Sequence, residues 1–335
     1  MNIPVIAFFN NKGRGGNTSM VYHLSWMFAD FGLRVLAVDL DPQANLTAAL
    51  LDENRLEEIV PGNGHPLTVF GSILPCIQGK AEIAEVHIEP ITDNLGLIPG
   101  DIALSSFEDQ LSGVWAKCLS GDHSAEQPIR VTSALFRVVQ QAGERYQANV
   151  ILVDMGPNLG AINRAALIAS DFVVLPVGTD FVSIQGLRYL GPSLRRWRRE
   201  WQERLSRNPI FDFPLPSGMM NPLGYIVMRH TIRLDRPMKA FKHWMALIPS
   251  IYREFVLGDT SEMHINIDTD PNGIANLKDY HSLMFLAQEA RKPMFDLRPA
   301  DGALGAHSYA VAEASKDFQM VARKIALRAG LGDLP

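Results

Sequence analysis

The chain has 335 residues, 47% of them hydrophobic and 20% charged, which is enough for a large core in one or two domains. The net charge of −5 excludes a global basic field that would attract nucleic acid or membrane. With only Cys76 and Cys118, no metal-ligand spacing among nine histidines and no apolar run near membrane length, we expect a cytoplasmic protein with free thiols, no signal peptide and no membrane partner.

Short apolar runs alternate with helical stretches along the chain. Runs rich in Val, Ile and Leu are typical of strands that are buried on both faces of a parallel sheet. The alternation predicts an α/β fold, with a doubly wound, mostly parallel sheet flanked by helices and ligands bound at the carboxyl ends of the strands. The predicted strands are Ile3–Phe9, Val35–Asp39, Leu95–Pro99, Val150–Asp154, Phe172–Val177 and Gly224–Met228.

We interpret the whole chain, residues 1–335, as a single domain. Residues 206–275 are expected to be an insertion within it, because the predicted helices Lys239–Leu247 and Ile251–Leu257 exceed what a minimal fold of this class needs. Residues 113–130, with their Gly, Ser, Asp, His and Pro, are expected to form an exposed loop.

The first predicted strand leads into a glycine-rich segment, residues 10–19, with the sequence Asn-Asn-Lys-Gly-Arg-Gly-Gly-Asn-Thr-Ser. A helical pattern follows over Met20–Phe31. A strand, a glycine-rich turn and a helix start together present backbone N–H groups to a phosphate. The predicted nucleotide-binding residues here are Gly13, Arg14, Gly15, Gly16, Asn17, Thr18 and Ser19.

Two later strands also end in polar residues. The second continues as Asp39-Leu40-Asp41-Pro42-Gln43-Ala44-Asn45, and the fourth as Asp154-Met155-Gly156-Pro157. Carboxylates at the ends of buried strands are suited to holding a cation or a water molecule. Asp41-Pro42 alone would be compatible with a simple turn, but Gln43 and Asn45 extend the pattern.

These segments resemble the ParA/MinD family of ATPases, whose deviant Walker A motif is K-G-G-x-G-K-[ST]-[ST]. Lys12 matches the family's early signature lysine, and Thr18 matches the hydroxyl that binds Mg²⁺. Asn17 stands where the family has its P-loop lysine, and Arg14 stands at the second glycine. The D-x-D-P-Q-x-N segment resembles the family's switch I, and the segment from Asp154 its switch II. The resemblance covers residues 1–190 well and the final third loosely.

The resemblance implies ATP or ADP and Mg²⁺ as cofactors and an ATPase activity. It implies that Thr18 binds Mg²⁺ directly, while Asp39 and Asp154 hold it through water. Asp41 would position the attacking water. Lys12 would reach the nucleotide of the partner in a two-fold homodimer, although a lysine at a strand–loop junction is often only solvated. Arg229 would contact adenine.

Asn17 departs from the family pattern at the residue that matters most for phosphoryl transfer. The P-loop lysine neutralises charge on the β- and γ-phosphates. Asparagine donates a hydrogen bond without a charge, and charge-assisted bonds are about twice as strong as neutral ones. We therefore expect weak hydrolysis, with Arg14 as a candidate replacement charge. The alternative is that the loop has drifted and holds phosphate poorly.

Two segments are candidates for partner contacts. Phe181–Gly186 resembles the family segment that opens a helix at the dimer interface, although an ordinary strand–helix connection fits it as well. Arg195, Arg196, Arg198 and Arg199 form the strongest basic run, in which Trp197 and Trp201 are expected to pack inward. These arginines would contact DNA phosphates non-specifically, or they would form a solvated face paired with nearby glutamates.

The final predicted helix, Ser315–Arg328, has an apolar side. MinD-type proteins bind membrane with a C-terminal amphipathic helix. Here the apolar side is weak, so we expect it to pack in the core. The residues on this side are Phe318, Val321, Ala322 and Ile325.

The sequence therefore predicts a ParA-like, ATP-binding homodimer that acts in DNA partition or cargo positioning, and an activator protein is a candidate partner. One alternative is a pseudo-ATPase scaffold that binds partners without turnover. The other is a dinucleotide-binding oxidoreductase, because Gly13-x-Gly15 before a helix partly imitates that fingerprint. The fingerprint fails at its third glycine, which would be Thr18.

Overall fold

The computed structural model describes most of the chain. The described residues are 3–10, 12, 16–59, 65–80, 82–208, 211–228, 238–261, 265–280, 282–303 and 305–334. The expectations for Gly13, Arg14, Gly15 and Arg229 lie outside these residues.

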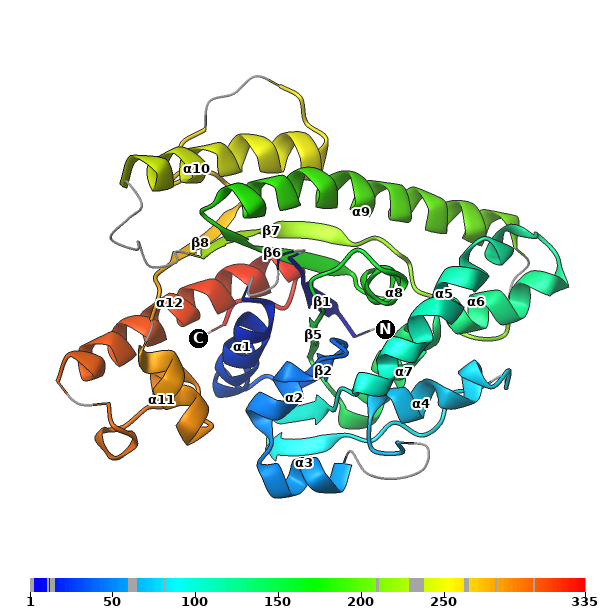
Figure 1. Cartoon of the computed structure of the whole chain (residues 1–335), viewed down its shortest axis with the longest axis horizontal. Coiled ribbons are helices and arrows are strands. Elements are labelled where there is room, and N and C mark those ends of the chain that lie inside the picture. Colours follow the sequence, from blue (N-terminus) through cyan, green and yellow to red (C-terminus); the bar gives the residue numbers. More distant parts are fainter. Residues whose placement is uncertain are drawn as a thin grey trace.

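One eight-stranded sheet forms the centre of the molecule, in the order β3-β4-β2-β5-β1-β6-β7-β8 (Figure 1). All neighbouring strands are parallel except β3 and β4, which form an antiparallel pair at one edge. The strands are β1 (Val5–Phe8), β2 (Val35–Asp39), β3 (Glu89–Thr92), β4 (Leu95–Ile98), β5 (Val150–Asp154), β6 (Phe172–Gly178), β7 (Asn221–Met228) and β8 (Gly273–Leu277).

The central strands are apolar on both sides, and this creates two cores. In β1, Val5 and Ala7 join the core on one face of the sheet, while Ile6 and Phe8 join the core on the other. All four residues are fully buried. Successive side chains of a strand point to opposite faces, so a continuous apolar run requires a layer of helices on each side.

Each face of the sheet has its own helix layer (Figure 1). The first comprises α4 (Val69–Ile77), α5 (Phe107–Trp115), α6 (Glu126–Thr132), α7 (Ala134–Tyr146), α8 (Ala161–Ile168), α9 (Phe181–Arg207), α10 (Met238–Ile251) and the π-helix η4 (Tyr252–Leu257). The second comprises α1 (Asn17–Asp30), α2 (Asn45–Leu50), α3 (Glu53–Ile59), α11 (Ser282–Ala290) and α12 (Ala306–Ala329). The short 3₁₀ helices are η1 (Ile102–Ser106), η2 (Lys117–Leu119), η3 (His123–Ala125), η5 (Met294–Asp296) and η6 (Pro299–Asp301).

The predicted α/β fold and its six strands are confirmed. The two edge strands, β3 and β8, were not predicted from the sequence. β3 has the sequence Glu-Pro-Ile-Thr and makes a tight hairpin with β4. β8 has the sequence Gly-Ile-Ala-Asn-Leu and pairs only with β7. Edge strands are buried less completely than central ones, so they lack the apolar run that identifies a buried strand.

Two further expectations need adjusting. The predicted loop at residues 113–130 is wrong for most of its length, since the segment holds the end of α5, η2, η3 and the start of α6. Within the proposed insertion, residues 206–275, β7 belongs to the central sheet and β8 begins. Only the part between these strands, including α10 and η4, can be additional to the sheet.

The inward packing of the amphipathic helices is as predicted. Trp197 and Trp201 of α9 are buried. In α12, Phe318 and Ile325 are buried with Val321 and Ala322. Among the described residues, no helix has both the length and the apolar character that crossing a membrane requires.

Candidate nucleotide site

A cavity of about 830 Å³ lies at the carboxyl ends of the strands. Its walls come from the start of α1, the segments after β2 and β5, α2 and α11. The volume is in the range of small-molecule and cofactor sites. Lining residues are Lys12, Gly16, Asn17, Thr18, Ser19, Tyr22, His23, Asp41, Gln43, Asn45, Ala48, Ala49, Met155, Pro157, Met284, Ala287, Gln288 and Arg291.

The N-terminus of α1 opens into this cavity. Gly16 is the N-cap residue, with φ 86° and ψ 10°, and no side chain caps the helix. A left-handed backbone favours glycine, and a Cβ at this position would also lie 3.0 Å from Cε of Met228. The uncapped first turn leaves backbone N–H groups and the positive end of the helix dipole available to an anion.

Two buried carboxylates stand behind the cavity. Asp39 ends β2 and Asp154 ends β5, and the parallel register places them directly opposite each other. Asp39 accepts hydrogen bonds from the backbone N–H of Thr47 at 2.9 Å and from its hydroxyl at 2.8 Å. Gly100 leaves room for the side chain of Asp39, because a Cβ at residue 100 would lie 2.8 Å from the carboxyl carbon of Asp39.

The charge of this pair is only partly compensated by the protein. Burial raises the pKa of Asp39 to about 6 against the opposing effect of its Thr47 hydrogen bonds. Burial, and then the negative charge of Asp39, raises the pKa of Asp154 well above its ordinary value. One oxygen of Asp154, Oδ1, accepts from the N–H of Met155 at 3.0 Å, while Oδ2 is buried without a partner.

These features fit a nearby divalent cation. A cation would compensate the negative charge of two adjacent buried carboxylates. It would also give an electrostatic partner to Oδ2 of Asp154, which has no hydrogen bond. The hydroxyl of Thr18 lies close enough to Asp154 to oppose the rise in the pKa of that carboxyl group, so it lies beside the carboxylate pair. No set of three or more acidic, His or Cys side chains within the described ranges has the spacing of direct metal ligands. Mg²⁺ usually keeps several waters and takes few protein ligands, so Thr18 would bind directly and both carboxylates through water.

Asp41 forms a turn and also reaches the cavity. Its Oδ1 accepts from the N–H of Gln43 at 3.0 Å, and its carbonyl accepts from the N–H of Ala44 at 2.8 Å. The side chain lines the cavity although its residue is only 6% exposed. The turn therefore holds the Asp41 carboxylate at the edge of the cavity, and its role in positioning a water molecule stays a prediction.

The side chain of Asn17 is engaged with the protein. Its Nδ2 donates to the carbonyl of Met155 at 3.2 Å and to that of Asn10 at 3.5 Å. Oδ1 is buried and has no partner. Since Nδ2 is committed to two carbonyls and Oδ1 only accepts, this amide does not present a donor to a phosphate. It links the glycine-rich segment to the segment after β5.

Lys12 also has a partner within the same chain. Its Nζ lies 2.6 Å from Oδ2 of Asp180, and both side chains are largely buried. Asp180 caps α9 and accepts from the N–H of Ser183 at 3.1 Å. The Lys12 ammonium, together with the Ser183 bonds, holds the pKa of Asp180 below its ordinary value despite the opposing effect of burial. A role for Lys12 across a dimer requires this ion pair to open.

The predicted site residues are thus largely brought together. Among the described ones, six line the cavity, and Asp39 and Asp154 lie just behind it. The wall formed by α11 and the side chains of Tyr22 and His23 were not predicted from the sequence. The α11 wall depends on the unrecognised strand β8, which precedes it. The six lining residues are Lys12, Gly16, Asn17, Thr18, Ser19 and Asp41.

The basic run on α9 divides into two pairs. Arg195 donates to the carbonyls of Phe255 and Val256, and Arg198 donates to that of Met220 at 2.7 Å. Arg196 and Arg199 are exposed, and Arg196 lies 3.9 Å from Glu200. Only the second pair is exposed, and the contact of Arg196 with Glu200 agrees with the alternative of a solvated face paired with glutamates.

Comparison with known proteins identifies the family. A family described as AAA domain matches residues 3–207. Soj of Bacillus subtilis, a sporulation initiation inhibitor protein, is 29% identical over 192 residues, which cover 57% of this chain and 64% of Soj. The chromosome partitioning protein ParA of Caulobacter vibrioides is 27% identical over 203 residues, covering 61% of this chain and 66% of ParA.

The chain belongs to the ParA/MinD family of P-loop ATPases. The matched part spans just under two thirds of Soj and of ParA. An uncharacterised protein of Methanocaldococcus jannaschii is 26% identical over a longer stretch, covering 74% of this chain and 81% of that protein.

Solved structures share the ParA-like fold over nearly the whole chain. Protein DIP2308 of Corynebacterium diphtheriae superposes with a TM-score of 0.72 at 22% identity, covering 97% of this chain and 98% of that one. The ATP complex of a McdA variant from Cyanothece gives 0.63 at 15% identity, covering 100% and 99%. A putative plasmid partition protein of Borrelia burgdorferi bound to AMPPNP gives 0.58 at 15% identity, covering 98% and 99%.

Proposed function

We propose that this ParA-like protein binds ATP with Mg²⁺, forms a nucleotide-dependent homodimer and acts in DNA partition or cargo positioning with weak hydrolysis. The observation that carries the proposal is the juxtaposition of the uncapped α1 N-terminus, Thr18 and the carboxylates of Asp39 and Asp154 at one cavity. An anion site beside a carboxylate pair whose charge is only partly compensated suits a Mg²⁺–polyphosphate.

We expect weak hydrolysis because the phosphate end of the cavity has little positive side-chain charge available. Asn17 brings no charge and uses its amide on the carbonyls of Met155 and Asn10. Lys12 is paired with Asp180. Phosphoryl transfer depends on stabilising the charge that spreads over the transferred group. Until Lys12 is released or Arg14 contributes, backbone N–H groups and the metal must carry this role. Arg14→Ala should weaken ATP binding if Arg14 replaces the lysine.

Exposed apolar side chains support dimerisation through the carboxyl edge of the sheet. Phe181 and Val182, at the start of α9, are 56% and 57% exposed. Ile102, after β4, is 72% exposed, and Leu159, after β5, is 37% exposed. All four follow the ends of parallel strands, on the same edge as the nucleotide cavity. Apolar side chains gathered around a site fit a partner surface, and a second copy would bring its Lys12 to this edge.

A pseudo-ATPase scaffold is the second candidate. The engaged amide of Asn17 favours it, because this amide fixes the segment after β5 to the glycine-rich segment without any ligand. Such a protein would bind ATP or a partner and show no turnover. The dinucleotide-binding oxidoreductase has no support beyond its two glycines, since Thr18 lies beside Asp154 where the third glycine would be required.

Titration calorimetry with ATP and Mg²⁺, combined with light scattering, tests the proposal. We expect Mg²⁺-dependent binding together with an increase in mass from monomer to dimer. Binding without a mass change would contradict the dimer. No binding in the presence of Mg²⁺ would contradict the proposal as a whole.

A further inference from the structure

The segment that links β5 to α8, residues 155–160, forms part of the cavity wall. In this β5–α8 segment, Met155 lines the cavity, and its carbonyl accepts the hydrogen bond from Asn17. A Cβ at Gly156 would lie 3.1 Å from Oδ1 of Asp41. The segment therefore contacts the glycine-rich segment on one side and passes close to Asp41 on the other, so its position affects the shape of the site.

A buried asparagine of α8 closes the β5–α8 segment into a turn. Asn163 is 1% exposed, and its Nδ2 donates to the carbonyls of Gly156 at 2.6 Å and Asn158 at 2.7 Å. Oδ1 of Asn158 accepts from the N–H of Gly160 at 2.8 Å. An amide nitrogen has two hydrogens to donate, and Asn163 uses both on this segment. The position of the segment therefore depends on the first turn of α8.

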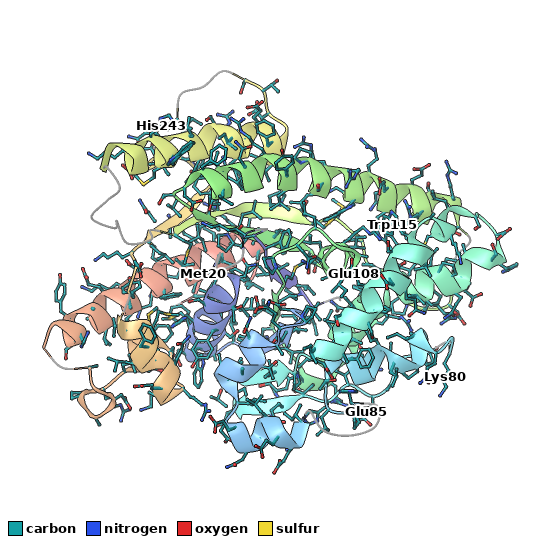
Figure 2. All side chains as sticks on the ribbon, viewed as in Figure 1. Met20, Lys80, Glu85, Glu108, Trp115 and His243 are labelled. Carbon is teal, nitrogen blue, oxygen red and sulfur yellow. The ribbon has the colours of Figure 1, made fainter. Side chains whose placement is uncertain are left out.

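The first turn of α8 has its capping group on another helix. Gly160 is the N-cap residue, and no side chain of its own caps α8. Instead the carboxylate of Glu108 on α5, which Figure 2 labels, accepts from the N–H groups of Ala161 and Ile162, the latter at 2.9 Å. A Cβ at Gly160 would lie 2.6 Å from Oε1 of Glu108, so glycine leaves room for this carboxylate. A negative charge at a helix N-terminus is favourable because it complements the helix dipole.

The rest of α8 is attached to α5 independently of Glu108. Arg164, one turn after Gly160, donates to the carbonyl of Leu111 at 3.5 Å and lies over the ring of Trp115 at 4.2 Å. Most other residues of α8 are buried in the core. Loss of the Glu108 carboxylate should therefore loosen the start of α8 and the β5–α8 segment without unfolding the helix.

We propose that Glu108 is a positioning residue of the nucleotide site. It holds the first turn of α8 and, through Asn163, the β5–α8 segment in the conformation that binds Mg²⁺–ATP. This inference rests on the proposed function. Glu108 lies outside the described lining of the cavity, so it acts only through the segment. A wall that is held in place before the ligand arrives spares the ligand the free-energy cost of ordering it.

Hydrogen exchange and Mg²⁺–ATP titration of Glu108→Gln test this role. Glutamine keeps the length of the side chain, but its amide nitrogen cannot accept from an N–H group. In the free variant, we expect the N–H groups of Ala161 and Ile162 to exchange about tenfold faster than in wild type. The N–H groups of the β5–α8 segment should also exchange faster. Mg²⁺–ATP should bind about three- to tenfold more weakly, because fewer molecules hold the segment in the binding conformation.

A reciprocal effect separates a positioning residue from a cap that only stabilises α8. If Glu108 positions the β5–α8 segment, bound Mg²⁺–ATP should restore slow exchange in that segment of Glu108→Gln, because binding and ordering are coupled. Glu108→Asp, which keeps the charge on a shorter side chain, should recover part of the lost affinity. Asp109→Asn changes the neighbouring, exposed carboxylate of α5 and is the matched control. It should leave both the exchange rates and the affinity unchanged.

Two results would overturn the inference alone. The first is wild-type exchange and wild-type affinity in Glu108→Gln. The second is faster exchange with an unchanged affinity for Mg²⁺–ATP, since Glu108 would then be only a structural cap. Failure of the wild type to bind Mg²⁺–ATP is a different result, which would overturn the proposed function and the positioning role with it.

Discussion

The cavity has an acidic side and a cationic side at the N-terminus of α1, and the two sides differ in how their charges are compensated. On the acidic side, Asp39 and Asp154 stand in register with an uncompensated carboxylate oxygen, and Thr18 lies beside them. On the cationic side, Asn17 carries no charge and donates to a backbone carbonyl, and Lys12 is paired with Asp180. The carboxylates on the acidic side therefore lack full compensation of their charge, while Asn17 and Lys12 on the cationic side are bound to the protein itself. If ATP binds here as proposed, its binding and its turnover would depend on different sides of the site.

The largest expected effect concerns the acidic side. Asp154→Asn replaces a buried carboxyl group, whose pKa is raised by burial and by the negative charge of Asp39. The free protein should become more stable, while Mg²⁺-dependent ATP binding should fall by about a hundredfold. Thermal unfolding with and without Mg²⁺–ATP measures both effects. Asp109→Asn, at an exposed position on α5, is the control. Undiminished stabilisation of Asp154→Asn by Mg²⁺–ATP would rule out the metal site.

The next effect concerns the ion pair on the cationic side. Lys12→Ala should abolish ATP-dependent dimerisation if this lysine serves the partner's nucleotide. Asp180→Asn should lower the ATP concentration needed for dimerisation, because it releases Lys12 while asparagine still caps α9. Light scattering over a range of ATP concentrations measures both. Equal dimerisation of Lys12→Ala and wild type would refute the role in trans.

A smaller effect should follow pH. The pKa of Asp39 is raised to about 6 by burial, so between pH 4 and 6 the native state binds a proton that the unfolded state releases. The contribution of this residue to the free energy of unfolding therefore increases as the pH falls through 6, by about 3 kcal/mol in total. His23, with a pKa lowered to about 4, acts in the opposite direction. Comparison with Asp39→Asn cancels the His23 contribution.

Denaturant unfolding of wild type and Asp39→Asn at several pH values measures the contribution of Asp39 together with its effect on Asp154. The free energy of unfolding of Asp39→Asn should exceed that of wild type most near pH 7.5, and the difference should decrease toward pH 5. A difference that does not change with pH would mean that Asp39 has an ordinary pKa in the folded protein.

The smallest effect concerns DNA. Arg196 and Arg199 are exposed, whereas Arg195 and Arg198 bind backbone carbonyls. If DNA is bound here, the double variant Arg196→Ala, Arg199→Ala should have a shallower slope of log binding constant against log salt concentration. The change in slope should correspond to the loss of about two phosphate contacts. Fluorescence anisotropy with non-specific duplex measures this, and Arg207→Ala serves as control. An unchanged salt dependence would remove this pair from any DNA interface.

Much of the phosphate site was predictable from sequence. Buried strands, a glycine-rich turn and strand-end carboxylates are local patterns, and the parallel topology then brings Asp39 next to Asp154. The partners of Asn17 and Lys12 were not predictable, because Met155 and Asp180 lie 138 and 168 residues away along the chain.

The α11 wall was missed for a different reason. β8 is a short edge strand without an apolar run, so nothing in the sequence placed the following helix beside α1. The region around α5 gives a similar lesson. Polar helices resemble loops in composition. Glu108 of α5, which Figure 2 labels, accepts from the N–H of Ile162 at 2.9 Å and so caps α8. Such caps depend on contacts between distant segments.

The most direct test of the account is single-turnover release of phosphate from ATP by wild type, Asn17→Ala and Asn17→Lys. Asn17→Ala removes the amide's bonds to Met155 and Asn10 without adding a charge, so it separates the two effects. The account predicts slow release by wild type, no gain in Asn17→Ala and a gain of about tenfold or more in Asn17→Lys, worth roughly 1–2 kcal/mol. Release by wild type as fast as by Asn17→Lys would contradict the claim that the missing lysine limits turnover.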